Sequence, residues 1–321
     1  MTKLDAALLA QEIRAHQATP WGVHPQTLAS ISLALTGKIA GDALERPQAA
    51  RGSQAMTGGV AVIPLRGLIT PRPSFFSLLF GGGGGLQSFR AAMREAIGSD
   101  EIAAVLIDID SPGGSTDLIA ETAAEIRALR GTKPIVAIAN TWAASAAYWL
   151  ASQADELVVT PSGEVGSIGV CQAHDDITKL QEDVGVKTTL ISAGAFKTEG
   201  NPYEPLSDEA RAAIQAQVDD FYGMFVADVA KGRGVSVGAV KSGYGEGRMV
   251  TAKRAVELGM ADRVDSYEAT LAKLVRSPGR RRIAAAKTSG TPEPNPPTGG
   301  EEAPDRPSDA YIDLMYGTPA R

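Results

Sequence analysis

Three short segments of this sequence combine residue types that nucleophilic catalysis needs, and the first contains Ser145. This serine is the one hydroxyl residue in the alanine run 143–147, near the start of a predicted helix that follows an apolar stretch of strand length. Small neighbours let a carbonyl group approach the serine, and a helix starting there directs the positive end of its dipole toward the hydroxyl. A serine tolerated in a packed, alanine-rich helix is the alternative interpretation.

The second segment is the pair Gly113 and Gly114, which separates an apolar strand pattern from a helical one. Such a turn leaves backbone N–H groups free, and they can hold a phosphate or the oxyanion of a tetrahedral intermediate. The third segment holds Lys197 between Gly194 and Gly200. Partial desolvation would favour a neutral, basic lysine there. An ordinary turn and a solvated surface lysine are the respective alternatives.

Composition excludes several other kinds of site. The chain of 321 residues carries 31 basic and 37 acidic residues, a formal net charge of −6, which argues against a nucleic-acid partner. The single cysteine, Cys171, excludes a multi-cysteine zinc site, and only three histidines leave little basis for a histidine-rich metal centre or a histidine-based triad. The glycine spacing of residues 163–169 does not fit a nucleotide-binding loop. We therefore expect no cofactor and no metal, and we interpret His174 as a surface histidine.

The elements that must position these residues alternate along the chain. Continuous apolar runs predict buried strands, and apolar residues at helical spacing predict helices between them. Continuous apolar strands alternating with helices indicate an α/β fold with a largely parallel sheet. The strands are expected at residues 59–65, 103–110, 134–139, 157–159 and 187–191, and the helices at 86–97, 116–130, 141–152, 207–231 and 251–258.

Composition also divides the chain into three parts. We expect residues 1–55 to form an N-terminal arm in which no chemistry is visible, residues 56–275 to form the folded domain, and residues 276–321 to form a disordered, proline- and glycine-rich tail. No uninterrupted apolar stretch reaches the roughly 18 residues that a membrane-spanning helix needs. We therefore expect a cytoplasmic protein without a membrane anchor.

The order of these motifs resembles the signal peptide peptidase A family of serine proteases, and most of all its phage-encoded members that mature capsids. The resemblance runs from Val60 to Val264 and rests on the following segments: Ser-Pro-Gly-Gly at 111–114, the alanine-rich run around Ser145, Gly-Ser-Ile-Gly at 166–169, Lys197 with Gly-Asn-Pro at 200–202, and the ending Ala255, Leu258, Gly259 and Asp262. It implies a ClpP/crotonase-type α/β fold with flanking helices and peptide cleavage by a serine–lysine dyad.

The family's functional residues map onto positions already singled out. Ser145 matches the nucleophile and Lys197 the general base. The backbone N–H of Gly113 or Gly114, together with that of Ala146, matches the oxyanion hole.

The resemblance further implies that the Ser167 hydroxyl orients the lysine and that the protein is a homo-oligomer. The absence of a membrane anchor favours capsid processing over degradation of signal peptides. The implied substrates are polypeptides such as capsid, scaffold or portal proteins, inside the assembling prohead in the host cytoplasm. The alternatives are a signal-peptide-degrading peptidase, a catalytically silent scaffold protein of the same fold, and a crotonase-type acyl-CoA enzyme. The presence of both Ser145 and Lys197 argues against the last two.

Overall fold

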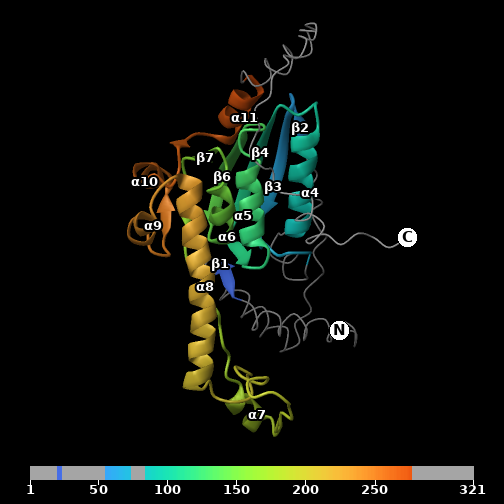
Figure 1. Ribbon diagram of the computed structural model, residues 1–321, viewed down its shortest axis with the longest axis vertical. Coiled ribbons are helices and arrows are strands. Elements are labelled where there is room, and N and C mark those ends of the chain that lie inside the picture. Colours follow the sequence, from blue (N-terminus) through green and yellow to red (C-terminus); the bar gives the residue numbers. More distant parts are fainter. Residues whose placement is uncertain (1–19, 24–54, 74–83, 277–321) are drawn as a thin grey trace, which may run out of the picture. The chain divides into compact units, whose positions relative to one another are not determined.

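The computed structural model describes residues 20–23, 55–73 and 84–276, which belong to one unit of the chain (Figure 1). The predicted tail and most of the predicted arm lie outside the described residues. The proposed boundary at residue 55 therefore stays a prediction. Among the described residues, no helix combines the length and the apolar character needed to cross a membrane.

An eight-stranded, mostly parallel sheet forms the centre of this unit. Its strands run in the order β10-β7-β6-β4-β3-β2; β8 pairs with the last residues of β6, and β9 pairs with β8. The pairs β3–β4, β4–β6, β6–β7, β7–β10 and β6–β8 are parallel, which confirms the predicted fold class. The strands are β2 Ala55–Thr57, β3 Val60–Arg66, β4 Ala104–Ser111, β6 Ile135–Ala144, β7 Glu156–Val159, β8 Glu164–Gly166, β9 Met249–Thr251 and β10 Arg263–Val264. A separate antiparallel pair joins β1 Trp21–Val23 to β5 Gly113–Ser115.

Helices cover both faces of the sheet, which explains why its strands are continuously apolar. In β3, Ala61 and Ile63 face the larger core under α4, α5 and α6, whereas Val60 and Val62 face a smaller core with Leu274 of α11. The helices are α4 Gly85–Gly98, α5 Ile119–Ala128, α6 Ala146–Ala151, α7 Thr178–Asp183, α8 Asp208–Arg233, α9 Val237–Gly243, α10 Ala252–Glu257 and α11 Tyr267–Arg276.

Two predicted elements differ from the structure. The helix predicted from residue 141 begins only at Ala146, because residues 142–144 continue β6 and pair with β8. The strand predicted at residues 187–191 does not form, and Ile191 is 96% exposed. An apolar, β-branched stretch has strand propensity, but a strand also needs a partner to accept its hydrogen bonds, and this one has none in the described structure.

Asp262 joins the end of α8 to the sheet. Its carboxylate accepts two hydrogen bonds of 2.9 Å from Arg233 and one of 2.6 Å from the Leu157 N–H in β7. Burial alone would raise the pKa of Asp262, but these hydrogen bonds and the Arg233 charge hold that pKa below its usual range. The fold therefore favours the ionised carboxylate.

We expect Asp262→Asn to lower the free energy of unfolding by about 1 kcal/mol at pH 7, because the ion pair with Arg233 is lost. The lowered pKa of Asp262 stabilises the folded state at pH values above the ordinary pKa of a carboxyl group. This contribution is lost as the pH falls through the pKa of Asp262 in the folded state. The difference in the free energy of unfolding between the wild type and Asp262→Asn should therefore be smaller at pH 3 than at pH 7, as measured by denaturant unfolding. Asp220→Asn, on an exposed position of α8, is the control. A deficit of equal size at both pH values would contradict this role.

Candidate active site

Ser145 lies at the sharp turn between β6 and α6. Its backbone has φ 53° and ψ −119°, a conformation that residues other than glycine rarely adopt. The turn is held from both sides, because the Ser145 N–H donates to the Gly166 carbonyl at 2.7 Å and the Ser145 carbonyl accepts from the Trp149 N–H at 2.9 Å. Strained serines on strand-to-helix turns are typical of nucleophiles in hydrolases.

The two predicted glycines form β5 directly beside this serine. A Cβ atom on Gly113, which has φ 97°, would lie 3.0 Å from the Ser145 Cβ and 2.2 Å from the Gly22 carbonyl oxygen. A Cβ atom on Gly114 would lie 1.8 Å from the Ile69 carbonyl oxygen. Only glycine therefore fits at either position. The loop is fixed further by Ser111, whose Oγ accepts from the Gly113 N–H at 3.1 Å.

Ala146 completes the group of predicted residues that the structure brings together. It is the first residue of α6, so its N–H has no acceptor within the helix and carries the partial positive charge of a helix start. Ser145 and Ala146 are both fully buried, and the Ser145 Oγ donates to the Gly169 carbonyl at 3.3 Å. A serine hydroxyl, a helix N-terminus and a glycine loop thus meet at one point, an arrangement that acyl transfer can use.

Lys197 is not part of this cluster in the single chain. It lies in an exposed turn after α7, where its N–H donates to the Gly194 carbonyl at 3.2 Å. No hydrogen bond links it to Ser145 or to Ser167 in the described part of the chain. Ser167 is buried with φ 52° and donates its N–H to the Arg248 carbonyl. The roles of Lys197 and Ser167 therefore stay predictions.

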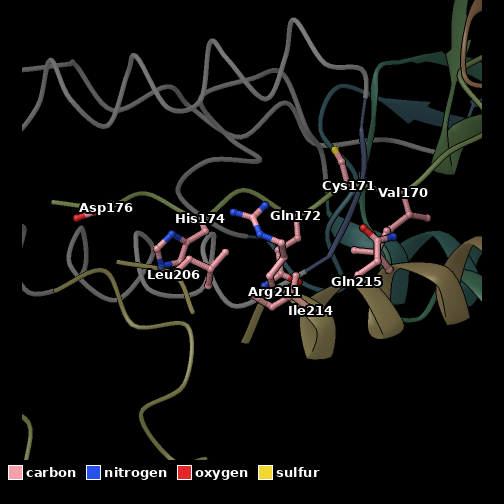
Figure 2. Close-up of a pocket in the computed structure, with 10 residues that line it drawn as sticks. Val170, Cys171, Gln172, His174, Asp176, Leu206, Arg211, Ile214 and Gln215 are labelled. Carbon is pink, nitrogen blue, oxygen red and sulfur yellow. The ribbon is translucent and has the colours of Figure 1, made fainter. Parts of the chain in front are cut away.

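A cavity of about 600 Å³ opens between the segment after β8 and α8 (Figure 2). Its lining does not include Ser145. His174 is half-buried in its lining, and its Nε2 is 3.1 Å from the Asn201 carbonyl. Cys171 also lines it, and burial raises the pKa of its thiol, so that this sulfur is a poor nucleophile. The lining residues are Val170, Cys171, Gln172, His174, Asp176, Leu206, Arg211, Ile214, Gln215 and Val218.

The sequence interpretation missed one segment at the site. Residues 20–23 belong to the arm in which no chemistry was expected, yet β1 pairs with β5 and Gly22 faces Ser145. The only local signal is a glycine between the apolar residues Trp21 and Val23. Such a short pattern does not predict which strand it will join.

The sequence of this chain is similar to those of known peptidases and phage proteins. Residues 127–278 match the model of peptidase family S49. The chain is 34% identical over 231 residues to capsid assembly protease C of Escherichia phage lambda, across 72% of this chain and 51% of that protein. It is 35% identical over 207 residues to head-tail preconnector protein GP5 of Enterobacteria phage P21, across 64% of this chain and 41% of that protein. The chain thus spans about half of the first relative and less of the second.

Among solved structures, a mutant of the 1510-N membrane-bound stomatin-specific protease aligns over 67% of this chain and 83% of its own, at 15% identity and a TM-score of 0.41.

Proposed function

Because the chain belongs to peptidase family S49, we propose that it is a serine endopeptidase with Ser145 as nucleophile and Lys197 as general base. The observation that carries this proposal is the strained turn at Ser145, held beside the Gly113–Gly114 loop and the first N–H of α6. A buried serine in a rare backbone conformation has a cost for stability, and such strain is concentrated at functional sites.

In this mechanism the Ser145 Oγ attacks the carbonyl carbon of a peptide bond while neutral Lys197 takes the hydroxyl proton. The N–H groups of Gly114 and Ala146 stabilise the oxyanion that forms on the carbonyl oxygen. The intermediate collapses as the lysine returns the proton to the leaving amine, and an acyl-serine remains. The same lysine then takes a proton from a water molecule that attacks the acyl group, and it returns this proton to the Ser145 Oγ as the C–O bond to the serine breaks and the carboxyl product leaves.

Lys197 reaches Ser145 from a second subunit in this proposal. Two features support it: the lysine is exposed within the chain that holds a buried Ser145, and the segment around it carries an exposed apolar surface. Exposed apolar patches of this kind are typical of subunit interfaces. The exposed apolar residues of the segment are Leu180, Val184, Val186, Leu190, Ile191, Phe196 and Tyr203.

The names of the two phage relatives favour substrates from virus assembly. One is called a capsid assembly protease and the other a head-tail preconnector protein. We therefore propose capsid, scaffold or portal polypeptides as substrates, processed within the assembling prohead in the host cytoplasm. The alternatives are a silent scaffold protein, which would lack a reactive serine, and a signal-peptide-degrading peptidase.

Covalent labelling tests the proposed activity. A fluorophosphonate probe forms a stable adduct only with an activated serine. Incubation of the native protein, followed by proteolytic digestion and mass spectrometry, should locate the probe group on Ser145 and on no other residue. Labelling of another residue, or labelling that survives prior denaturation, would contradict the assignment and favour the scaffold alternative.

Gly114→Ala tests the glycine loop. The new Cβ would lie 1.8 Å from the Ile69 carbonyl oxygen, so the loop beside Ser145 must shift away from Ile69. We expect kcat/KM to fall about 10²- to 10³-fold, as for loss of one oxyanion donor. The free energy of unfolding should fall by about 1–3 kcal/mol through overpacking. Gly98→Ala, at a position with open space around it, should change neither quantity appreciably. Full activity in Gly114→Ala would exclude this loop from the oxyanion hole.

A further inference from the structure

The short strand β1 fills a slot beside the nucleophile. On one side it pairs antiparallel with β5, with Gly22 opposite Gly114. On the other side Trp21 exchanges two backbone hydrogen bonds with Cys171, of 2.8 and 3.0 Å. The strand is therefore bonded along both edges, as an extended peptide would be in a groove between two strands.

The register directs Gly22 toward the catalytic groups. Both backbone groups of Trp21 point to Cys171, so the alternation of an antiparallel ladder directs those of Gly22 to Gly114. The Gly114 N–H, proposed for the oxyanion hole, then faces the Gly22 carbonyl. An ideal Cβ on Gly22 would lie 3.4 Å from the Ser145 Oγ and 3.5 Å from the Ala146 nitrogen. Gly22 thus pairs with Gly114 and leaves room for no more than a small side chain beside Ser145 and Ala146.

Ser145 and the strand beside it are both buried. Ser145 is 0% exposed, so no substrate carbonyl reaches its hydroxyl while β1 is in place. Trp21 and Val23, on either side of Gly22, are 6% and 3% exposed. Pro20 adds an anchor, because its carbonyl accepts a 3.0 Å hydrogen bond from the Thr116 hydroxyl. Residues 20–23 are therefore held in place by the burial of side chains as well as by backbone hydrogen bonds.

We propose that residues 20–23 occupy the peptide-binding groove of their own chain and keep the peptidase latent until this strand is displaced. The proposal rests on the proposed function and adds a regulatory segment to it. It also defines the ligand that the groove takes: an extended peptide with a glycine or another small residue facing Ser145. The reason is space, since the Cβ of an alanine would already be in contact with the Ser145 Oγ.

Gly22→Leu should expel the strand, because a leucine side chain would overlap Ser145 and Ala146. When only a minor fraction of a protein is competent to bind, its apparent reactivity is the intrinsic reactivity multiplied by that fraction. We therefore expect Gly22→Leu to raise the rate of fluorophosphonate labelling at Ser145 and kcat/KM on a short peptide, each by about tenfold or more. Gly22→Ala should give a smaller rise. Gly98→Leu, in open space on α4, should leave both rates at the wild-type value.

A synthetic peptide of residues 18–25 provides a test that does not depend on the folding of a variant. It should inhibit cleavage of a short substrate by the wild-type protein competitively, and the same peptide with Gly22→Leu should inhibit at least about tenfold more weakly.

The outcomes separate the two proposals. If wild-type Ser145 is labelled while Gly22→Leu is labelled no faster, or more slowly, the latency proposal fails and the peptidase proposal stands. Equal inhibition by the two peptides would also overturn latency. If no form of the native protein is labelled at Ser145, including Gly22→Leu with a native circular dichroism spectrum, the peptidase proposal itself fails.

Discussion

Ser145→Ala should lower kcat/KM on a peptide substrate by at least about 10⁴-fold, because it removes the atom that forms the acyl intermediate. The fold should persist, since the change removes one buried oxygen whose hydrogen bond to the Gly169 carbonyl is a long 3.3 Å. The backbone hydrogen bonds that hold the turn are independent of the side chain. Steady-state cleavage assays and thermal unfolding of the purified variant measure the two effects.

Ser152→Ala is the matched control for this variant. Ser152 is also fully buried and lies just after α6, where its hydroxyl donates to the Trp149 carbonyl at 2.8 Å. We expect this variant to lose about 1 kcal/mol of stability and to keep its activity. An equal loss of activity in both serine variants would show that packing around α6, rather than a nucleophile, accounts for the effect. Substantial activity in Ser145→Ala would remove the nucleophile assignment.

Lys197→Ala should lower kcat/KM by at least about 10³-fold, because the serine then has no base to take its proton. Its stability should be that of the wild type, since Lys197 is exposed in the single chain. Lys187→Ala, an exposed lysine of the same segment, and His174→Ala should both remain active. Loss of activity in His174→Ala together with survival of Lys197→Ala would identify a histidine base instead.

Mixing the two inactive variants tests whether the lysine comes from a partner subunit. In randomly mixed oligomers, about one site in four combines an intact Ser145 with an intact Lys197 from the neighbouring chain. Ser145→Ala and Lys197→Ala, unfolded and refolded together, should therefore recover about a quarter of the wild-type activity. Each variant refolded alone should stay inactive. No recovery in oligomers shown to be mixed would place the dyad within one chain.

Local patterns predicted much of the fold. The apolar runs that became β3, β4 and β7 are long enough to mark buried strands, and the helical spacing beginning at Leu86 marked α4. Gly259, with φ 75°, ends its helix as a left-handed glycine should. The sequence predicted a helix at residues 142–144, where the structure has the end of β6. This difference was not predictable, because alanine is compatible with both structures and the pairing with β8 decides between them.

The sequence by itself determined the order of the elements, the glycine loop and the identity of Ser145 as the candidate nucleophile. All three follow from residues that are neighbours along the chain, where periodicity, glycine conformation and helix starts act locally. Only the tertiary structure decided that Gly22 lies against Ser145 and that Lys197 is exposed away from it. Both depend on contacts between segments far apart in sequence, such as the pairing of Gly22 with Gly114, and hydrogen bonding between strands does not specify its partner from the residues of one strand alone.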